Sequence, residues 1–198
     1  AFMDVTGLSG TRQDIAHGLQ ARIQADLGLP SSLGVASNKL VAKIANNIGK
    51  SQVRSGDYPR AITEVKPGQE AAFLARLDVR ELWGVGPKTA DTLRMMGIET
   101  IGALAAYDER TLLERFGKHG YDLSRRARGI DNRPVETESE TKSISRETTF
   151  SQDVSDVATL KHTLRRLSDS VGYRLRKSDL RGTTIKIKLR WHDFTTVT

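Results

Sequence analysis

Apolar residues recur at helical spacing near the start of the chain. Ile15, Leu19 and Ile23 are four residues apart, which predicts one amphipathic helix. Gly28 and Pro30 follow the last of them, and both residue types end helices. We therefore expect this helix to stop before residue 30.

A second helix is predicted between two short strands. Residues 32–36 and 61–65 are short apolar runs typical of strands, and the polar residues 51–60 predict a loop before the second of them. Pro67 and Gly68 then predict a turn. The helix between the strands places its apolar residues on one face, and these are Leu40, Val41, Ile44, Ala45 and Ile48.

Residues 1–7 are apolar and β-favouring, with no turn or cap before them. They predict a strand that is entered in its middle, so we expect the natural chain to extend further upstream.

The middle of the chain predicts a small all-helical unit. Its short helices are broken at glycines, and a domain boundary is expected near Lys66. Residues 131–141 lack periodicity, contain Pro134 and predict a linker. The apolar positions of the helical unit are Phe73, Leu74, Leu77, Leu93, Ile98, Ile101, Leu104, Leu112 and Phe116.

The last segment predicts a strand, a long helix and a second strand. The strands are expected at residues 143–150 and 183–191. This order is typical of a small α+β domain, but a sheet of two strands is marginal by itself, so the domain is expected to be incomplete at Thr198. The apolar stripe of the helix is Val157, Leu160, Leu164, Leu167, Val171 and Leu175.

Composition narrows the functional classes. The 198 residues include no cysteine, which excludes disulfides and thiolate metal sites and favours a reducing cytoplasm. No apolar run is long enough to span a bilayer, and no signal peptide is recognisable, so no membrane partner is expected. The net charge is +7, and residues 139–198 carry +5 of it. Such a basic segment favours nucleic acid as the partner over a merely basic surface.

The strongest local motif is LWGVGPKTA at residues 82–90, which predicts a helix-hairpin-helix. Gly84 and Gly86 let the hairpin turn tightly and let backbone N–H groups approach a phosphate. Pro87 suits the first position of the next helix, and Lys88 adds a positive charge. A Gly-x-Gly turn can also be a plain connector, but the flanking helices favour phosphate binding.

Two weaker signals keep a structural alternative open. Residues 117–120 form a second glycine-flanked turn, and Arg125, Arg126 and Arg128 follow it; a looser phosphate contact and a structural role are equally favoured. In residues 184–190, strict alternation places three cations about 7 Å apart on one strand face, where they could follow a DNA backbone or simply face solvent. These cations are Lys186, Lys188 and Arg190.

No catalytic or metal-binding constellation stands out. Adjacent acids such as Asp108 and Glu109 lie where helix-start residues would, and a structural or exposed role is expected for them. The same role is expected for the four scattered histidines, His17, His119, His162 and His192.

Taken together, the chain resembles Y-family DNA polymerases of the DNA polymerase IV and kappa class over essentially its whole length. The order of the motifs is the order of the family, and the combination is far more specific than any single motif. The residues that carry the resemblance are GVASNKLVAKIA at 34–45, LWGVGPKTA at 82–90, GID at 129–131, RPV at 133–135, KSISRE at 142–147 with Thr149 and Phe150, and LRWHDF at 189–194.

The resemblance implies an α+β multidomain fold built from parts of three polymerase domains. Residues 1–66 would be a partial palm, and residues 67–130 a small all-helical thumb that contains the helix-hairpin-helix. Residues 131–141 would be a linker, and residues 142–198 an incomplete, truncated α+β little finger.

The resemblance also implies the function of an error-prone translesion DNA-directed DNA polymerase. Such enzymes act by two-metal nucleotidyl transfer, and in the family a Ser-x-Asp-Glu motif just before the residues matching 1–7 binds two Mg²⁺ ions together with an Asp near the N-terminus. None of those ligands lies in this sequence. The chain alone is therefore expected to be inactive, no catalytic or metal residue is assigned, and Asp4 is expected to be structural.

The implied binding residues fall into two groups. Lys50 matches the lysine that contacts the triphosphate of the incoming deoxynucleotide, although Ser51, Gln52 and Val53 replace the family's usual Pro-x-Gly after it. The residues expected to contact DNA are Gly84, Val85, Gly86, Lys88, Thr89, Lys142, Ser143, Ser145, Arg146, Lys186, Lys188 and Arg190.

The implied partners are primer-template DNA, a deoxynucleoside triphosphate and a sliding clamp bound through a tail beyond Thr198. A non-catalytic helix-hairpin-helix DNA-binding protein is the alternative. An intact Ser-x-Asp-Glu motif in frame upstream of Ala1 would decide for the enzyme.

Overall fold

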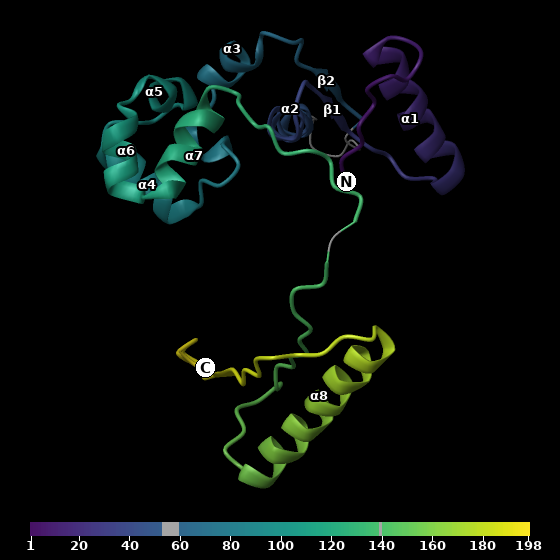
Figure 1. Ribbon diagram of the computed structural model, residues 1–198, viewed down its shortest axis with the longest axis vertical. Coiled ribbons are helices and arrows are strands. Elements are labelled where there is room, and N and C mark those ends of the chain that lie inside the picture. The colour runs from purple at the N-terminus through teal and green to yellow at the C-terminus, as the bar shows by residue number, and fades with distance from the viewer. Residues whose placement is uncertain (53–59, 139) are drawn as a thin grey trace. The chain divides into compact units, whose positions relative to one another are not determined.

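The computed structural model describes residues 1–52, 60–138 and 140–198, and it divides into two compact units, residues 1–136 and 137–198. Figure 1 shows the elements of both units, which are described separately here. Most of the loop predicted at residues 51–60 lies outside the described residues.

The first unit begins with a small α/β layer. Strands β1 (Leu33–Val35) and β2 (Ile62–Glu64) pair in parallel, with Leu33 opposite Ile62. Helices α1 (Arg12–Leu27) and α2 (Lys39–Ser51) both contact the two strands, which lie between them in Figure 1. Both predicted helices and both predicted strands of this region are confirmed.

Local capping chemistry sets the ends of these helices. Thr11 caps α1, accepting a hydrogen bond from the Asp14 N–H group, while the Asp14 carboxylate accepts one from the Thr11 N–H group. Gly28 ends α1 in the left-handed conformation, at φ 67°. Asn38 caps α2, accepting a hydrogen bond from the Val41 N–H group at 3.0 Å.

A chain of short helices follows and shares one apolar core with α2. Its predicted apolar positions are buried or packed against this core, which confirms the helical unit. Figure 1 shows α4 to α7 gathered together. The elements are α3 (Glu70–Ala75), the 3₁₀-helix η1 (Val79–Glu81), α4 (Pro87–Met95), α5 (Ile101–Ala106), α6 (Glu109–Phe116) and α7 (Lys118–Ala127).

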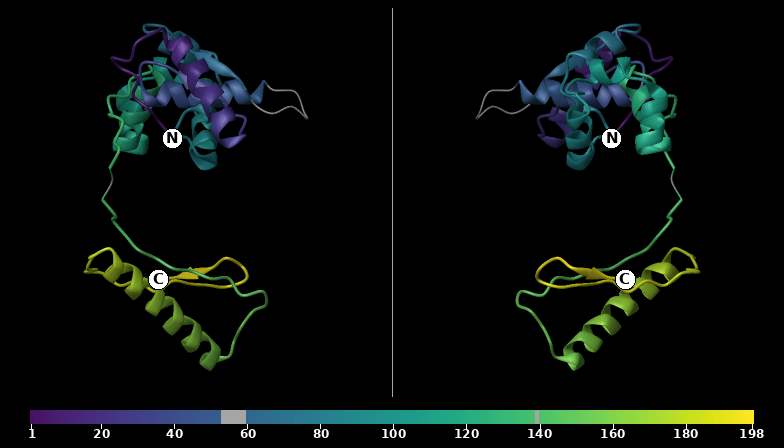
Figure 2. Two further views of the ribbon diagram at one scale, coloured as in Figure 1. Left: turned by 90° about the vertical axis from the view of Figure 1, so that its right-hand side faces the viewer. Right: turned by 90° about the vertical axis from the view of Figure 1, so that its left-hand side faces the viewer.

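The second unit consists of one long helix and a short hairpin (Figure 2). Helix α8 (Val157–Lys177) is the predicted long helix. Strands β3 (Leu189–Arg190) and β4 (Thr196–Val197) pair antiparallel. No described residue of this unit is fully buried.

Three strand predictions are wrong or too long in this structure. Residues 1–7 and 143–150 form no strand, and only Leu189 and Arg190 of residues 183–191 do. A strand needs a neighbour to satisfy its N–H and C=O groups. Among the described residues, such pairing exists only between β1 and β2 and between β3 and β4, apart from one isolated bridge between Asp78 and Thr100.

A search of the described helices found none with the length and apolar character needed to cross a membrane.

Gly34 allows the close approach of β1 to α2. A Cβ atom at this position would overlap the Ala42 carbonyl oxygen and lie 2.6 Å from the Asn46 backbone nitrogen. Both are helix backbone atoms, which cannot move aside cheaply.

We predict that Gly34→Ala lowers the free energy of unfolding by about 2–3 kcal/mol, because β1 must separate from α2. Gly18→Ala is the matched control, since nothing lies within 4 Å of its added Cβ and alanine favours the helix; it should raise stability by about 0.5–1 kcal/mol. Urea unfolding followed by circular dichroism measures both. Equal effects of the two substitutions would contradict the close approach.

Candidate nucleic-acid interface

The predicted hairpin is built by residues 82–86, which we call the hairpin turn. They connect η1 to α4, and the Val85 N–H group donates to the Leu82 carbonyl at 2.9 Å. The Leu82 side chain is anchored in the core with only 1% of its residue surface exposed. Gly84 has a φ of 106°, a conformation that side-chain-bearing residues rarely adopt.

Gly86 has a different role from Gly84. Its φ of −85° and ψ of 173° are ordinary extended values, so the tight turn does not require glycine here, contrary to the sequence-based interpretation. Nothing lies within 4 Å of the position that a Cβ atom would take. The space in front of Gly86 is therefore open to an approaching group.

The first turn of α4 follows directly and presents free donors. Pro87 occupies its first position, and no side chain caps it. The N–H groups of Lys88 and Thr89 therefore lack an intrahelical partner, as at any helix start. With the positive end of the helix dipole, they form a surface suited to a phosphate.

Trp83, within the hairpin turn, lies among cations and a second aromatic ring. The Arg133 guanidinium carbon is 4.6 Å from the centre of its ring, and Lys43 Nζ is 5.5 Å away. The Phe2 ring stacks on it at a centroid distance of 6.2 Å. Such contacts between cations and an aromatic face are attractive, most of all for tryptophan.

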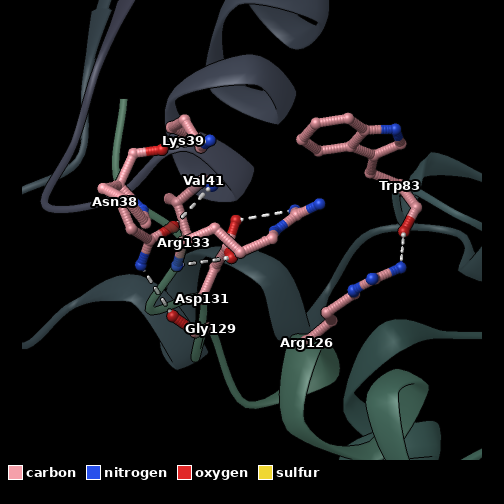
Figure 3. A network of polar contacts seen from close by, with 9 residues as sticks. Asn38, Lys39, Val41, Trp83, Arg126, Gly129, Asp131 and Arg133 are labelled. Carbon is pink, nitrogen blue, oxygen red and sulfur yellow. Dashed lines mark hydrogen bonds and ion pairs between the residues drawn. The ribbon is translucent and has the colours of Figure 1, made fainter. Parts of the chain in front are cut away.

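Arg133 is itself held by a buried carboxylate. Its Nε and Nη2 atoms donate to the two oxygens of Asp131 at 2.7 and 2.8 Å, and the Asp131 side chain is only 4% exposed (Figure 3). These hydrogen bonds from Arg133 lower the pKa of the Asp131 carboxyl below its ordinary value. The pair is thus charged at neutral pH.

The segment around this pair is fastened to the start of α2. Asn38 Nδ2 donates to the Gly129 carbonyl at 2.8 Å, and Lys39 Nζ donates to the Pro134 carbonyl. Figure 3 shows the hydrogen bond from Asn38 to Gly129. The first residues of the predicted linker therefore belong to the first unit and lie against the start of α2.

A second turn lies beside the hairpin turn. Arg126 Nη1 donates to the Trp83 carbonyl at 3.2 Å (Figure 3). A Cβ atom on Gly84 would be 2.6 Å from the same Nη1 and 3.6 Å from His119 Cε1. His119 belongs to the first turn of α7, so the weaker glycine-flanked turn at residues 117–120 adjoins the hairpin.

The arginines after this second turn have partners inside the unit. Arg125 lies over the Tyr121 ring at 5.8 Å, and Arg128 donates to the Ala105 carbonyl and pairs with Glu109. These arginines therefore have structural contacts within the unit, whereas the second phosphate contact stays a prediction.

Lys50 lies in the last turn of α2 and is exposed. Of the residues that replace the family's usual motif after it, Ser51 and Gln52 are described, and Val53 lies outside the described residues. The role of Lys50 stays a prediction.

The other predicted DNA contacts belong to the second unit. Four of them, between Lys142 and Arg146, lie in the segment before α8 and outside any strand. In this segment, the Ser145 carbonyl accepts a hydrogen bond from Arg174 at 3.0 Å. In β3, the side chain of Arg190 donates to Thr196 Oγ1 and lies 6.0 Å from the Phe194 ring centre. All of them are exposed: Lys142, Ser143, Ser145, Arg146, Lys186, Lys188 and Arg190.

The alternating pattern at residues 184–190 does not bury an apolar face here. Ile185 is 91% exposed, and Ile187 and Leu189 are also exposed. Lys186 and Lys188 lie outside β3, so the regular spacing of cations along one strand is not formed in this structure.

The described residues contain no group of three or more His, Cys, Asp or Glu side chains that could hold a metal ion. Asp4 Oδ1 accepts a hydrogen bond from the Thr6 N–H group at 2.9 Å, which is a local turn contact. The described residues therefore do not fit a magnesium site.

Comparison with models of known families shows which family the chain resembles over its three segments. The impB/mucB/samB family model matches residues 1–47, the IMS family HHH motif matches residues 67–98, and the impB/mucB/samB family C-terminal domain matches residues 141–198. The chain belongs to the impB/mucB/samB family. The resemblance to Y-family polymerases is thereby confirmed, and the hairpin turn lies within the matched HHH motif.

Similar curated proteins include DNA polymerases IV from several bacteria. That of Dehalococcoides mccartyi (strain CBDB1) is 42% identical over the whole chain, and that of Desulfatibacillum aliphaticivorans is 37% identical. That of Listeria monocytogenes serotype 4a (strain HCC23) is 38% identical. These matches cover 50%, 49% and 54% of the relatives, so the chain spans about half the length of the curated relatives it matches.

Sequence reasoning missed the residues around Trp83. For Arg126 the sequence favours a phosphate contact and a structural role equally, and it indicates no role of their own for Lys43, Asp131 and Arg133. The available signals were a tryptophan inside the hairpin motif and an Asp-x-Arg spacing after α7, neither of which shows that the two segments meet.

We predict that the Asp131–Arg133 pair stabilises the fold at neutral pH but not in acid. Because the folded pKa of Asp131 is lowered, its contribution is present above the ordinary pKa and is lost as pH falls through the folded value. Asp131→Asn should lower the free energy of unfolding by about 1 kcal/mol at pH 7, allowing for the exposure of Arg133. The deficit should shrink below about pH 4.

Urea unfolding of both proteins from neutral to acid pH measures this difference. A deficit that stays constant into acid would show that Asp131 does not act through its charge.

Proposed function

We propose that this chain supplies part of the DNA-binding surface of a translesion DNA-directed DNA polymerase. The main support for this proposal is the open N-terminus of α4, which directly follows Gly86 in the segment matched by the HHH motif. A phosphate there would receive backbone N–H groups and the charge of Lys88, without reading any base. The names of the relatives, DNA polymerase IV, supply the enzyme class.

The parts of the chain would belong to different polymerase domains. Residues 1–66 would belong to the palm, residues 67–130 to the thumb and residues 142–198 to the little finger, with residues 131–141 as linker. The hairpin residues and the exposed cations of the second unit would contact the backbone of primer-template DNA. These contacts would be largely independent of sequence and sensitive to salt.

The chemistry of the whole protein would be nucleotidyl transfer to a primer. The Mg²⁺ ions of that reaction would be held by residues other than those described here, because no described cluster fits them. Lys50 would contact the triphosphate of the incoming deoxynucleotide, where a cation offsets phosphate charge. A sliding clamp is a further proposed partner of the whole protein, and the cytoplasm its proposed location.

A non-catalytic DNA-binding protein is the second candidate, favoured only by the hairpin and the basic charge. An intact Ser-x-Asp-Glu motif in frame upstream of residue 1 would favour the enzyme, and its absence would favour the binding protein.

We predict that Gly86→Val weakens binding of primer-template duplex by about tenfold or more while the chain stays folded. The backbone accepts valine and space is open, but the branched side chain would cover the α4 N–H groups. Lys88→Ala should cost less and reduce the slope of log affinity against log salt by about 1. Fluorescence anisotropy over a salt series measures both effects.

Gly18→Val, an equally open glycine on α1, is the matched control and should bind like the wild type. Circular dichroism checks that all variants keep their helices. A folded Gly86→Val protein with unchanged DNA affinity would make the hairpin turn a mere connector.

We predict that Lys50→Ala, made in a longer protein that includes this chain, raises KM for the deoxynucleotide or lowers kcat/KM. DNA affinity should stay nearly unchanged, because only the triphosphate loses a partner. Steady-state primer extension and duplex binding measure the two quantities. Weakened DNA binding with normal nucleotide kinetics would assign Lys50 to the DNA instead.

A further inference from the structure

Two arginines from later in the chain contact Trp83, one at its ring and one at its backbone carbonyl. The Arg133 guanidinium faces its ring at 4.6 Å, and Arg126 donates to its carbonyl at 3.2 Å. Figure 3 shows Arg126 and Arg133 directed toward Trp83 from separate parts of the chain. Trp83 immediately precedes Gly84, so these contacts act on the hairpin turn itself.

The direction of Arg133 is fixed rather than adaptable. Its Nε and Nη2 atoms are both used by Asp131, which sets the plane of the guanidinium. The Asp131 side chain is nearly buried, and residues 129 and 134 on either side are tied to Asn38 and Lys39. Arg133 therefore presents one defined face to the indole.

The hairpin end of the contact is equally constrained. A Cβ atom on Gly84 would lie 2.6 Å from Arg126 Nη1, so the absence of a side chain at Gly84 leaves room for this arginine. The chain then runs through Val85 and Gly86 into α4. Whatever holds Trp83 thus sets the direction in which the N–H groups of Lys88 and Thr89 point.

Arg133 is badly placed to be a phosphate contact of its own. Two of its donor atoms are bound to Asp131, whose negative charge would repel a phosphate near the pair. Its side chain is 45% exposed, but its charge is already neutralised locally.

We propose that Arg133 is a positioning residue for the DNA-binding hairpin. Held by Asp131, it keeps Trp83 and therefore the α4 N–H groups in the orientation that accepts a phosphate. The segment that leaves α7 thereby controls the affinity of the hairpin without touching DNA. This inference rests on the proposed DNA-binding function.

The decisive test is Asp131→Asn in the 198-residue chain, because two explanations predict opposite signs. Removal of a negative charge alone should strengthen binding to DNA. Loss of the partner that directs Arg133 should weaken it, by about threefold to tenfold, because fewer molecules hold the competent hairpin. Binding of primer-template duplex over a salt series, measured by anisotropy, distinguishes them.

Arg133→Ala and Arg133→Lys complete the set. Both should weaken binding by a similar factor, since lysine keeps the charge but lacks the planar fork. The salt slope should stay unchanged, whereas loss of a direct phosphate contact would reduce it by about 1. Arg110→Ala, which removes an exposed arginine paired with Glu114 on α6, is the matched control and should bind like the wild type.

Fluorescence separates this inference from the proposed function. In a Trp191→Phe background Trp83 is the sole tryptophan, and Arg133→Lys should shift its emission and increase its quenching by acrylamide if the contact exists. Unchanged emission would overturn the inference whether or not the chain binds DNA. Tighter DNA binding by Asp131→Asn, or a reduced slope of log affinity against log salt in Arg133→Ala, would also overturn the inference. A wild-type chain that binds no duplex would instead refute the proposed function.

Discussion

The geometry of the candidate interface depends on one apolar core that continues from α2 into the short helices. Leu40 and Ile44 on α2 share it with Leu82 at the start of the hairpin turn. Burial of a leucine side chain stabilises a fold by about 1.5–3 kcal/mol, far more than an exposed ion pair. The core therefore fixes where the hairpin turn begins, and the polar contacts only adjust how it points.

Charge in the first unit serves structure as much as any partner. Arg126 binds a backbone carbonyl, Arg128 pairs with Glu109, and Arg133 pairs with Asp131. A guanidinium with several donors can satisfy backbone and carboxylate groups that water would otherwise solvate. A positive net charge thus indicates a class of partner, but it does not tell which cations remain available to that partner.

The sequence predicted the features that depend on residues close together along the chain. It did not predict the features that depend on contacts between distant segments. Helical periodicity placed Leu40, Leu104 and Leu112 correctly, because a buried helix face repeats every three to four residues. The strand predicted at residues 143–150 did not form, because a strand needs a partner that no local pattern supplies. The hairpin motif was recognisable for its glycines, whereas the contact between Trp83 and Arg133 joins segments whose meeting only the fold shows.

The two glycines of the hairpin turn have different roles, which the sequence motif alone does not show. Gly84 is required by its positive φ, so its role is to let the turn form, and its lack of a side chain also leaves room for the Arg126 guanidinium. Gly86 has ordinary dihedral angles and empty space in front of it, so nothing within the first unit demands the absence of a side chain. Gly86 therefore leaves the first turn of α4 open to the outside. Under the proposed function, a DNA phosphate would approach the helix N-terminus at this point, inside the segment matched by the HHH motif.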